Sequence, residues 1–158
     1  SEPVFGGVYK LTAVENEQGE IIPKIKCSEN VEKITIPHFK KVYRLYNKDN
    51  GKAIADYMTV YDEVVDENEP MMLFDPYATW KTKNVCNYQA RELLVPVFLK
   101  GKKVYESPAL KDIQTYCKQQ VDTLWDEIKR FDNPQTYYVD LSQKLWDIQQ
   151  ELLRKNRN

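Results

Sequence analysis

The stretch VYRLYNKDNGKAIADYMTVY, residues 42–61, decides the fold class of this 158-residue chain. Two runs rich in β-branched and aromatic residues, 42–46 and 53–61, flank the turn-forming segment NKDNGK. An Asn-Gly pair between two such runs is a strong signal for a β-hairpin. The tyrosines of both runs are typical of cross-strand packing, although they would also suit stacking on a nucleotide. We therefore expect an antiparallel hairpin at the centre of a β-rich region.

Further strands are expected on both sides of this hairpin, because similar runs are separated by turn residues. Residues 8–14 and 21–26 are predicted to form one hairpin, and residues 88–99 and 103–105 another. A short strand is predicted at residues 71–74. Pro23 and Pro96 fall inside two of these strands and lack a backbone N–H, so each strand is expected at a sheet edge or at a bulge.

Two helices are predicted to close the chain. The first takes Ser107 as its N-cap and Pro108 as its first helical residue, and it ends at Asn133-Pro134. The second starts near Asp140 as its cap. Both carry apolar residues at helical spacing: Leu110, Ile113, Cys117, Val121, Leu124, Ile128 and Phe131 in the first, and Leu141, Leu145, Ile148 and Leu152 in the second. Such stripes normally pack in a core, but they would also dock onto another domain.

The predicted fold class is α+β, with antiparallel β-hairpins in the first two thirds followed by two long C-terminal α-helices. We interpret residues 1–158 as a single domain with a β-rich part (1–106) and a helical part (107–158). The chain begins Ser-Glu-Pro and enters an apolar run at residues 4–9 at once. We therefore expect it to be a fragment of a larger protein.

Composition excludes several classes of function. The chain has 23 basic and 24 acidic residues, whereas nucleic-acid modules are usually strongly basic. No apolar run reaches the ~18 residues of a membrane span. Three cysteines and one histidine lack metal-ligand spacing, so we expect no metal site and reduced thiols in a cytoplasmic protein. No P-loop, GxSxG, HExxH or CxxC motif is present, so no catalytic residue is predicted.

The best candidate for a binding site is the lysine-rich segment 23–44. Its cations exceed its acids, Glu29 and Glu32, by four charges; they are Lys24, Lys26, Lys33, Lys40, Lys41 and Arg44. Ammonium groups beside the Ser-Glu-Asn turn would suit a phosphate. The plainer interpretation is a solvated surface loop. His38 has no nucleophile or orienting carboxylate near it in sequence, so a surface or structural role is expected.

Four segments resemble the C-terminal domain of nicotinate phosphoribosyltransferase, of the longer bacterial type. They are PVFGGVYKLTAVENEQGEIIPKIKCSENVEKIT, KKVYRLYNKDNGKAIAD, ARELLVPVFLKGKKVYESP and YYVDLSQKLWDIQQELL. GGVYKL and KIKCSENVEK are the most specific parts. The resemblance implies a parent enzyme that converts nicotinate and phosphoribosyl pyrophosphate to nicotinate mononucleotide and pyrophosphate, coupled to ATP hydrolysis. It also implies ATP and Mg²⁺ for that enzyme, with no cofactor in this fragment.

The resemblance further implies a dimeric enzyme whose catalytic barrel carries a phosphorylated histidine. That barrel is not in this chain, so His38 does not inherit the role. In related nicotinamide-using enzymes, a K-x₇-K element brings lysines to phosphates bound in the partner subunit. Lys26 and Lys33 resemble that pair at a spacing one residue shorter, which implies phosphate binding (phosphoribosyl pyrophosphate or ATP) in trans.

Two function classes therefore stand. One is an accessory domain of a cytoplasmic enzyme of NAD synthesis, which needs the barrel of the same chain as its partner and is inactive alone. The other is a non-catalytic protein-interaction module. An accessory domain should expose an apolar patch where the barrel belongs, near residues 4–8 or along one helix.

Overall fold

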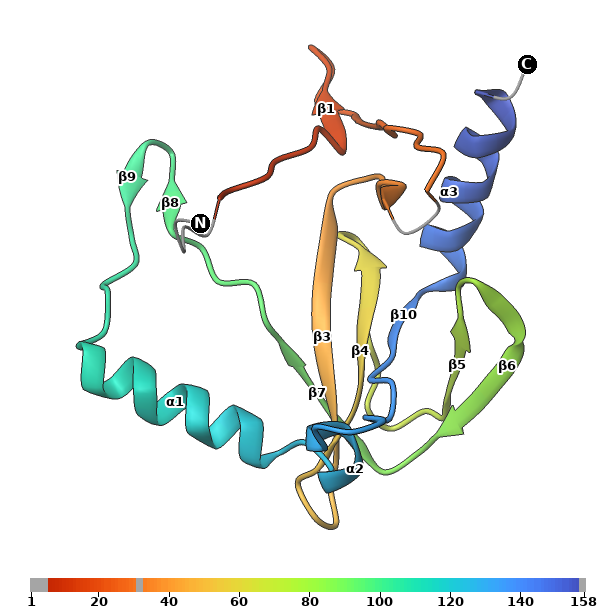
Figure 1. Cartoon of the computed structure of the whole chain (residues 1–158). Coiled ribbons are helices and arrows are strands. Elements are labelled where there is room, and N and C mark those ends of the chain that lie inside the picture. The colour runs from red at the N-terminus through yellow and green to blue at the C-terminus, as the bar shows by residue number, and fades with distance from the viewer. Residues whose placement is uncertain (1–5, 31–32, 157–158) are drawn as a thin grey trace. The chain divides into compact units, whose positions relative to one another are not determined.

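A computed structural model describes residues 6–30 and 33–156 of the chain (Figure 1). It divides into two compact units, which we describe separately. The sheet unit comprises Lys41–Ser142, and the terminal unit comprises the described residues of Ser1–Lys40 and Gln143–Asn158. The α+β class is confirmed, whereas the interpretation of the whole chain as one domain stays a prediction.

A four-stranded sheet with the order β10-β4-β3-β7 organises the sheet unit. The predicted central hairpin is confirmed as β3 and β4, which are neighbours in this sheet. Its turn is stabilised by Asn47, whose Oδ1 accepts hydrogen bonds from the backbone N–H groups of Asp49 and Asn50. Gly51 follows with a φ of 66°, which glycine adopts without strain. The strands are β3 (Lys40–Asn47), β4 (Ala53–Val60), β7 (Tyr88–Glu92) and β10 (Val139–Leu141).

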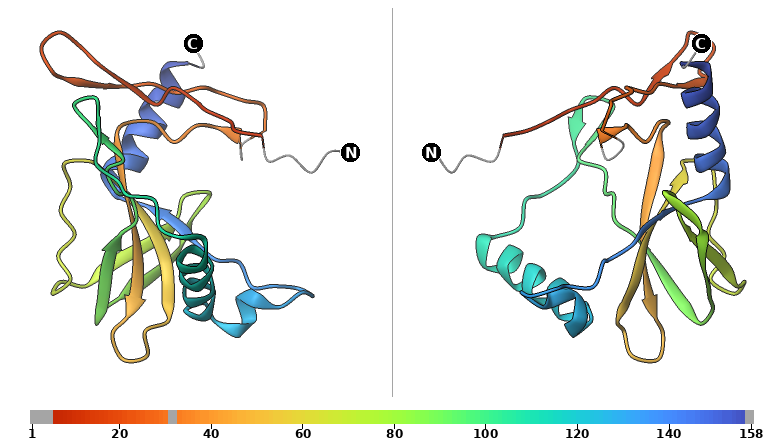
Figure 2. Two further views of the ribbon diagram at one scale, coloured as in Figure 1. Left: turned by 90° about the vertical axis from the view of Figure 1, so that its left-hand side faces the viewer. Right: turned by 45° about the vertical axis from the view of Figure 1, so that its right-hand side comes forward.

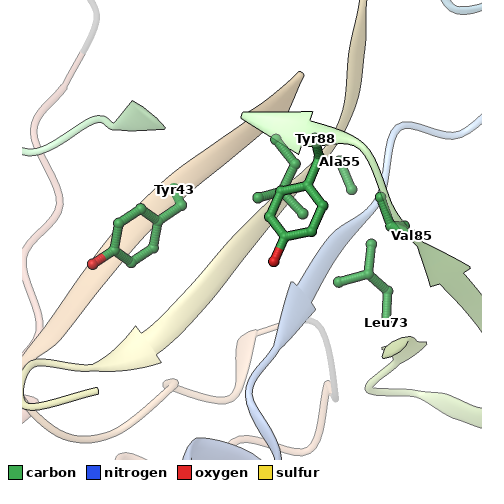
Figure 3. Packing of buried hydrophobic residues seen from close by; sticks show 6 residues of the cluster. Tyr43, Ala55, Leu73, Val85 and Tyr88 are labelled. Carbon is green, nitrogen blue, oxygen red and sulfur yellow. The ribbon is translucent and has the colours of Figure 1, made fainter. Parts of the chain in front are cut away.

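The two faces of this sheet differ in chemistry. On one face an apolar cluster packs against the hairpin of β5 (Met71–Asp75) and β6 (Ala78–Val85), as Figure 3 shows. Its buried members are Tyr43, Leu45, Ala55, Leu73, Val85 and Tyr88. Tyr88 also donates its hydroxyl to the carbonyls of Asp66 and Glu69, which ties the acidic loop to the core. Tyr43, one of the tyrosines predicted to pack across strands, is a buried member of the same cluster.

The opposite face carries arginines. Arg44 and Arg91 lie directly opposite each other on β3 and β7, a like-charge arrangement that costs energy unless each cation has its own partner. Arg44 forms two hydrogen bonds to the carboxylate of Asp56 on β4, at 2.8 and 3.0 Å. Tyr137 donates its hydroxyl to the same carboxylate at 2.9 Å, and Arg44 lies over its ring. The bond to Asp56 raises the pKa of Arg44, so this guanidinium stays charged.

Helix α1 (Leu110–Asp122) lies on this arginine face, opposite the β5–β6 hairpin (Figure 2). Its link to the sheet is polar. Gln120 accepts hydrogen bonds from Arg91 at 2.6 Å and from the hydroxyl of Tyr46 at 3.0 Å. Arg91 also lies over the rings of Tyr46 and Tyr116. No residue of α1 is buried, so the predicted apolar stripe is not part of the core.

The predicted limits of the first helix were wrong. Ala109 in an extended conformation, not Ser107, precedes the helix, and α1 ends at Asp122 instead of at Asn133. The reason is tertiary: Lys52 donates its ammonium to the carbonyls of Asp122 and Leu124, and the backbone N–H of Ala53 bonds Thr123. These carbonyls would otherwise continue the helix. The predicted remainder of this helix is replaced by the short helix α2 (Asp126–Lys129).

Three other predictions along the chain were corrected. Residues 88–99 are not one strand, because Pro96 lies between β7 and the small hairpin of β8 (Phe98–Leu99) and β9 (Lys102–Lys103). Strand β6 was not predicted, since all but its first and last residues are exposed and its sequence lacks an apolar face. The expected helix cap Asp140 lies instead on β10, which pairs in parallel with β4. The second helix, α3 (Gln143–Lys155), begins three residues later.

The terminal unit holds the predicted first hairpin in shorter form. Strands β1 (Ala13–Glu15) and β2 (Ile21–Pro23) pair antiparallel, but residues 8–12 and 24–26 are not strands. The carbonyl of Thr12 instead accepts from the backbone N–H groups of Lys24 and His38. His38 is buried at a φ of 79°, and its Nδ1 accepts from the N–H of Phe39. The structure therefore favours the structural role for this histidine.

We predict that Asp56→Asn destabilises the chain by about 2 kcal/mol, because it leaves the half-buried Arg44 without a counter-charge. Equilibrium unfolding in urea of the 158-residue chain measures this. Asp126→Asn is the matched control, since Asp126 pairs with Lys129 at the surface and its side chain is 90% exposed. Equal unfolding midpoints for the two variants would contradict the assigned importance of the Arg44–Asp56 pair.

Candidate functional site

The two lysines of the predicted phosphate site lie on the two arms of one loop in the terminal unit. The backbone N–H of Thr35 donates to the carbonyl of Lys26 at 3.3 Å, which closes the loop at its base. Both Lys26 and Lys33 are exposed, and neither forms an ion pair with a residue in the described ranges 6–30 and 33–156. Lys10 donates its ammonium to the carbonyl of Lys33 at 2.7 Å and so adds a third cation to the loop. Residues 31–32, which include Glu32, lie outside the described part.

Two other cations of the lysine-rich segment are already engaged. Lys40 donates its ammonium to the carbonyls of Ile36, Pro37 and His38, and burial lowers its pKa to about 8. Arg44 is neutralised by Asp56. Four cations of the segment remain, and two of them, Lys26 and Lys33, lie on the exposed loop. Such ammonium groups supply charge and N–H donors to a phosphate but no general base or nucleophile.

A separate pocket with a volume of about 710 Å³ lies in the sheet unit. Part of its wall is the apolar cluster described above, through Ala55, Leu73 and Val85 (Figure 3). Other parts of its lining come from β6, α2 and the segment that leads into β10. Sequence reasoning did not find this pocket, because its lining comes from segments far apart in the chain.

Asp140 is the most unusual residue of this pocket. Its side chain is almost completely buried, with 4% of the residue exposed, and its Oδ1 has no hydrogen-bond partner in the described chain. Burial raises the pKa of Asp140 to about 6, with the nearby Asp75 adding to the shift and Lys83 opposing it. A buried carboxylate without a donor costs free energy, so this residue is a candidate binding group. The flanking Val139 and Leu141 could have indicated a strand here, but no sequence signal indicates the missing donor.

A smaller hollow of about 300 Å³ lies beside the acidic loop. Within residues 6–30 and 33–156, no group of three or more His, Cys, Asp or Glu side chains is placed to hold a metal ion. In the same ranges, no helix has the length and apolar character needed to cross a bilayer.

Comparison with known proteins identifies the family. The profile of the nicotinate phosphoribosyltransferase C-terminal domain matches residues 39–149. A nicotinate phosphoribosyltransferase of Bacillus subtilis is 41% identical over 145 residues, which cover 92% of this chain and 29% of that protein. The Caenorhabditis elegans protein of that name is 32% identical and is covered over 27% of its length. The chain therefore belongs to the nicotinate phosphoribosyltransferase C-terminal domain family.

A solved structure agrees with this assignment at the level of the fold. The crystal structure of human nicotinic acid phosphoribosyltransferase superposes with a TM-score of 0.68 over 75% of this chain, at 23% identity. The superposed part is 24% of that chain. The chain thus spans roughly a quarter of the length of its relatives.

We predict that Asp140→Asn stabilises the chain by about 1–2 kcal/mol at pH 7, after discounting the pKa shift for screening by solvent. A carboxyl group whose pKa is raised by folding opposes folding above pH 6. The penalty disappears as the pH falls through 6 toward the unfolded value near 3.8. Urea unfolding of both proteins should therefore show a gap at pH 7 that closes by pH 4. The exposed rim variant Glu127→Gln should show no such gain; equal behaviour of the two variants would contradict burial as the cause.

Proposed function

We propose that this chain is the C-terminal accessory domain of a nicotinate phosphoribosyltransferase, a cytoplasmic enzyme of NAD biosynthesis. The parent enzyme would join nicotinate and phosphoribosyl pyrophosphate to give nicotinate mononucleotide and pyrophosphate, with ATP hydrolysis. Two observations support this assignment: the chain matches the family model, and it covers 25–29% of the length of several relatives. The absence of a disulfide among Cys27, Cys86 and Cys117 is compatible with the cytoplasm. On this proposal the catalytic barrel belongs to the rest of the polypeptide, and the 158 residues alone turn over no nicotinate.

The observation that carries the proposal is the uncovered apolar face of α1. Leu110 and Ile113 are 71% and 48% exposed, and Val121 is also exposed. A helix stripe with this periodicity normally packs against a partner. Covering these side chains would contribute about 1.5–3 kcal/mol for each one fully buried. Further exposed apolar side chains follow β7: Leu94, Val95, Val97, Phe98 and Leu99.

We assign the catalytic barrel of the same polypeptide as the occupant of the α1 face. The patch was expected either near residues 4–8 or along one helix. The α1 face fits the second alternative; of the first, Val4 and Phe5 lie outside the described residues and Val8 is exposed. About three quarters of the length of each matching relative lies outside the region of similarity, so an internal partner of sufficient size is expected. A free-standing interaction module would use the same face for a different protein, and the experiment below separates the two cases.

Within this enzyme we propose that Lys26 and Lys33 hold a phosphate of phosphoribosyl pyrophosphate or of ATP, across the interface of a homodimer, with Mg²⁺ supplied alongside the nucleotide. Their position on one closed loop beside Lys10, and their lack of a counter-ion in the described chain, support the proposal. Clustered ammonium groups raise the local concentration of a polyphosphate. The loop would bind and position the anion, whereas the chemistry would take place on residues of the barrel.

The docking proposal predicts opposite behaviour in two contexts. In the 158-residue chain, Ile113→Asp should change the unfolding free energy by less than about 0.5 kcal/mol, because the side chain is not buried. In the full-length enzyme it should destabilise by about 2–4 kcal/mol, because a carboxylate would then be buried at the interface. Thermal and urea unfolding of both proteins measure this. Gln114→Asp, on the polar side of the same helix, is the control; if Ile113→Asp is equally harmless in the full-length enzyme, the barrel does not cover this face.

The lysine proposal predicts that Lys33→Ala and Lys26→Ala in the full-length enzyme raise the KM for phosphoribosyl pyrophosphate or ATP about 5- to 50-fold, a loss of roughly 1–2 kcal/mol per charge-assisted contact. The KM for nicotinate should stay unchanged. Lys24→Ala is the matched control, since Lys24 is exposed on the same segment but outside the proposed pair. Unaltered phosphate-substrate kinetics in both variants would remove these lysines from the site.

A further inference from the structure

We propose that the pocket between β10, α2 and the β5–β6 hairpin binds a small aromatic cation, whose N–H donors reach the carboxylate of Asp140 while its ring packs on the apolar wall. The proposal concerns the sheet unit alone and does not depend on the lysine loop. Neither the family match nor the relatives' names assign a ligand to this pocket. Its volume of about 710 Å³ falls in the range of pockets that enclose small organic ligands.

The carboxylate is the specific element of this site. Oδ1 of Asp140 is buried and has no donor within the described chain, although Lys83 is close enough to affect its pKa. No described lysine or arginine forms an ion pair with it. Asp75, the other carboxylate near it, already accepts from the N–H groups of Tyr77 and Ala78. Oδ1 itself has almost no accessible surface, so a ligand in this pocket approaches the carboxylate through its second oxygen. A cationic N–H donor there satisfies the carboxylate most strongly.

The remaining lining favours a flat apolar body over a polar one. Leu73, Phe74 and Val85 supply apolar side chains. Trp125 and Tyr137 add aromatic rings whose polar atoms are already used, since the indole N–H donates to Ala53 and the phenol donates to Asp56. These rings can therefore offer only their surfaces, which attract aromatic and cationic groups.

The charges that line the pocket disfavour an anion. Asp140 on β10, Asp75 on β5 and Glu127 on α2 are opposed by Lys81 and Lys83 on β6, both of which are exposed. The buried charge is therefore the negative one, whereas the positive charges are screened by solvent. With a pKa of about 6, the Asp140 carboxyl is mostly ionised at pH 7.5, so it accepts hydrogen bonds at that pH. Tyr57 on β4 completes the titratable groups facing Asp140, and its pKa of about 12 keeps it neutral there.

Benzamidine is a suitable probe, because it joins a planar amidinium to an aromatic ring. We expect the 158-residue chain to bind benzamidine in calorimetric titration at pH 7.5 at least about ten times more tightly than benzoate, which has the same shape and the opposite charge. Asp140→Asn should weaken benzamidine binding about tenfold or more, the amount expected for losing one charge-assisted contact. Glu127→Gln removes the same charge from the exposed rim and should change affinity less than about twofold. No binding, equal binding of benzoate, or equal effects of the two variants would overturn the proposal.

A second measurement needs no variant and so does not depend on how Asp140→Asn folds. The Asp140 carboxyl can be titrated by carbon NMR in the wild-type chain with and without saturating benzamidine. Binding to the ionised carboxylate should lower its pKa by about one unit or more, since a tenfold preference for the charged form equals one unit. Benzamidine affinity should fall correspondingly below pH 6. An unchanged pKa at saturation would show that the cation binds elsewhere and would overturn the assignment to Asp140.

Discussion

The sheet unit depends on one constraint, which is the need to cover the edge of β4 that faces away from β3. One edge of this strand pairs with β3, and the other would expose unpaired backbone groups if nothing covered it. Separate short segments of the C-terminal third of the chain supply hydrogen-bond partners for this edge. Thr123 accepts from Ala53, Tyr138 accepts from Asp56, and Met58 accepts from Ser142. Because these contacts lie along the whole strand, the segment from 123 to 142 must run beside β4 and cannot continue as a helix.

The other features of the unit follow from this edge. The capture of residues 122–124 by Lys52 and Ala53 ends α1 after 13 residues, although the apolar periodicity continues. The pairing of β10 carries Asp140 into a position between β4 and the β5–β6 hairpin, where its flanking residues satisfy their backbone bonds but its carboxylate finds no donor. Helix α1 therefore ends with its apolar stripe uncovered. The pocket acquires the buried carboxylate of Asp140 for the same reason. Both are consequences of contacts between segments far apart in the chain, 70 and 72 positions at the end of α1 and 83 positions where Asp140 pairs with Tyr57.

This origin explains which parts of the fold could be predicted from the sequence. Hairpins such as β3–β4 and β8–β9 depend on turn residues at Asn47, Gly51 and Gly101, so local sequence is sufficient to predict them. The α+β class follows from the same signals together with the helical stripes. The limits of α1 and the existence of β10 depend on hydrogen bonds between distant segments, and the local periodicity gave the wrong answer there. Asp140 was given a helix-capping role because a polar residue before an apolar stripe resembles a cap, whereas a strand three residues long leaves little pattern to detect.

The two candidate sites, the lysine loop and the Asp140 pocket, differ in whether their side chains are exposed or buried. The charges of the lysine loop were visible in the sequence, but the side chains of Lys26 and Lys33 are exposed. Such groups gain a defined role only when a second surface limits their freedom, as a phosphate site in a larger assembly would. The Asp140 pocket is the reverse case. Its carboxylate is held on β10, which pairs with β4, and is buried beside Asp75 and Lys83, so the cost of leaving it without a hydrogen-bond donor is already part of the folding free energy. A ligand that supplies the missing donor recovers that cost on binding, which gives this pocket a physical reason for selectivity that the loop does not possess by itself.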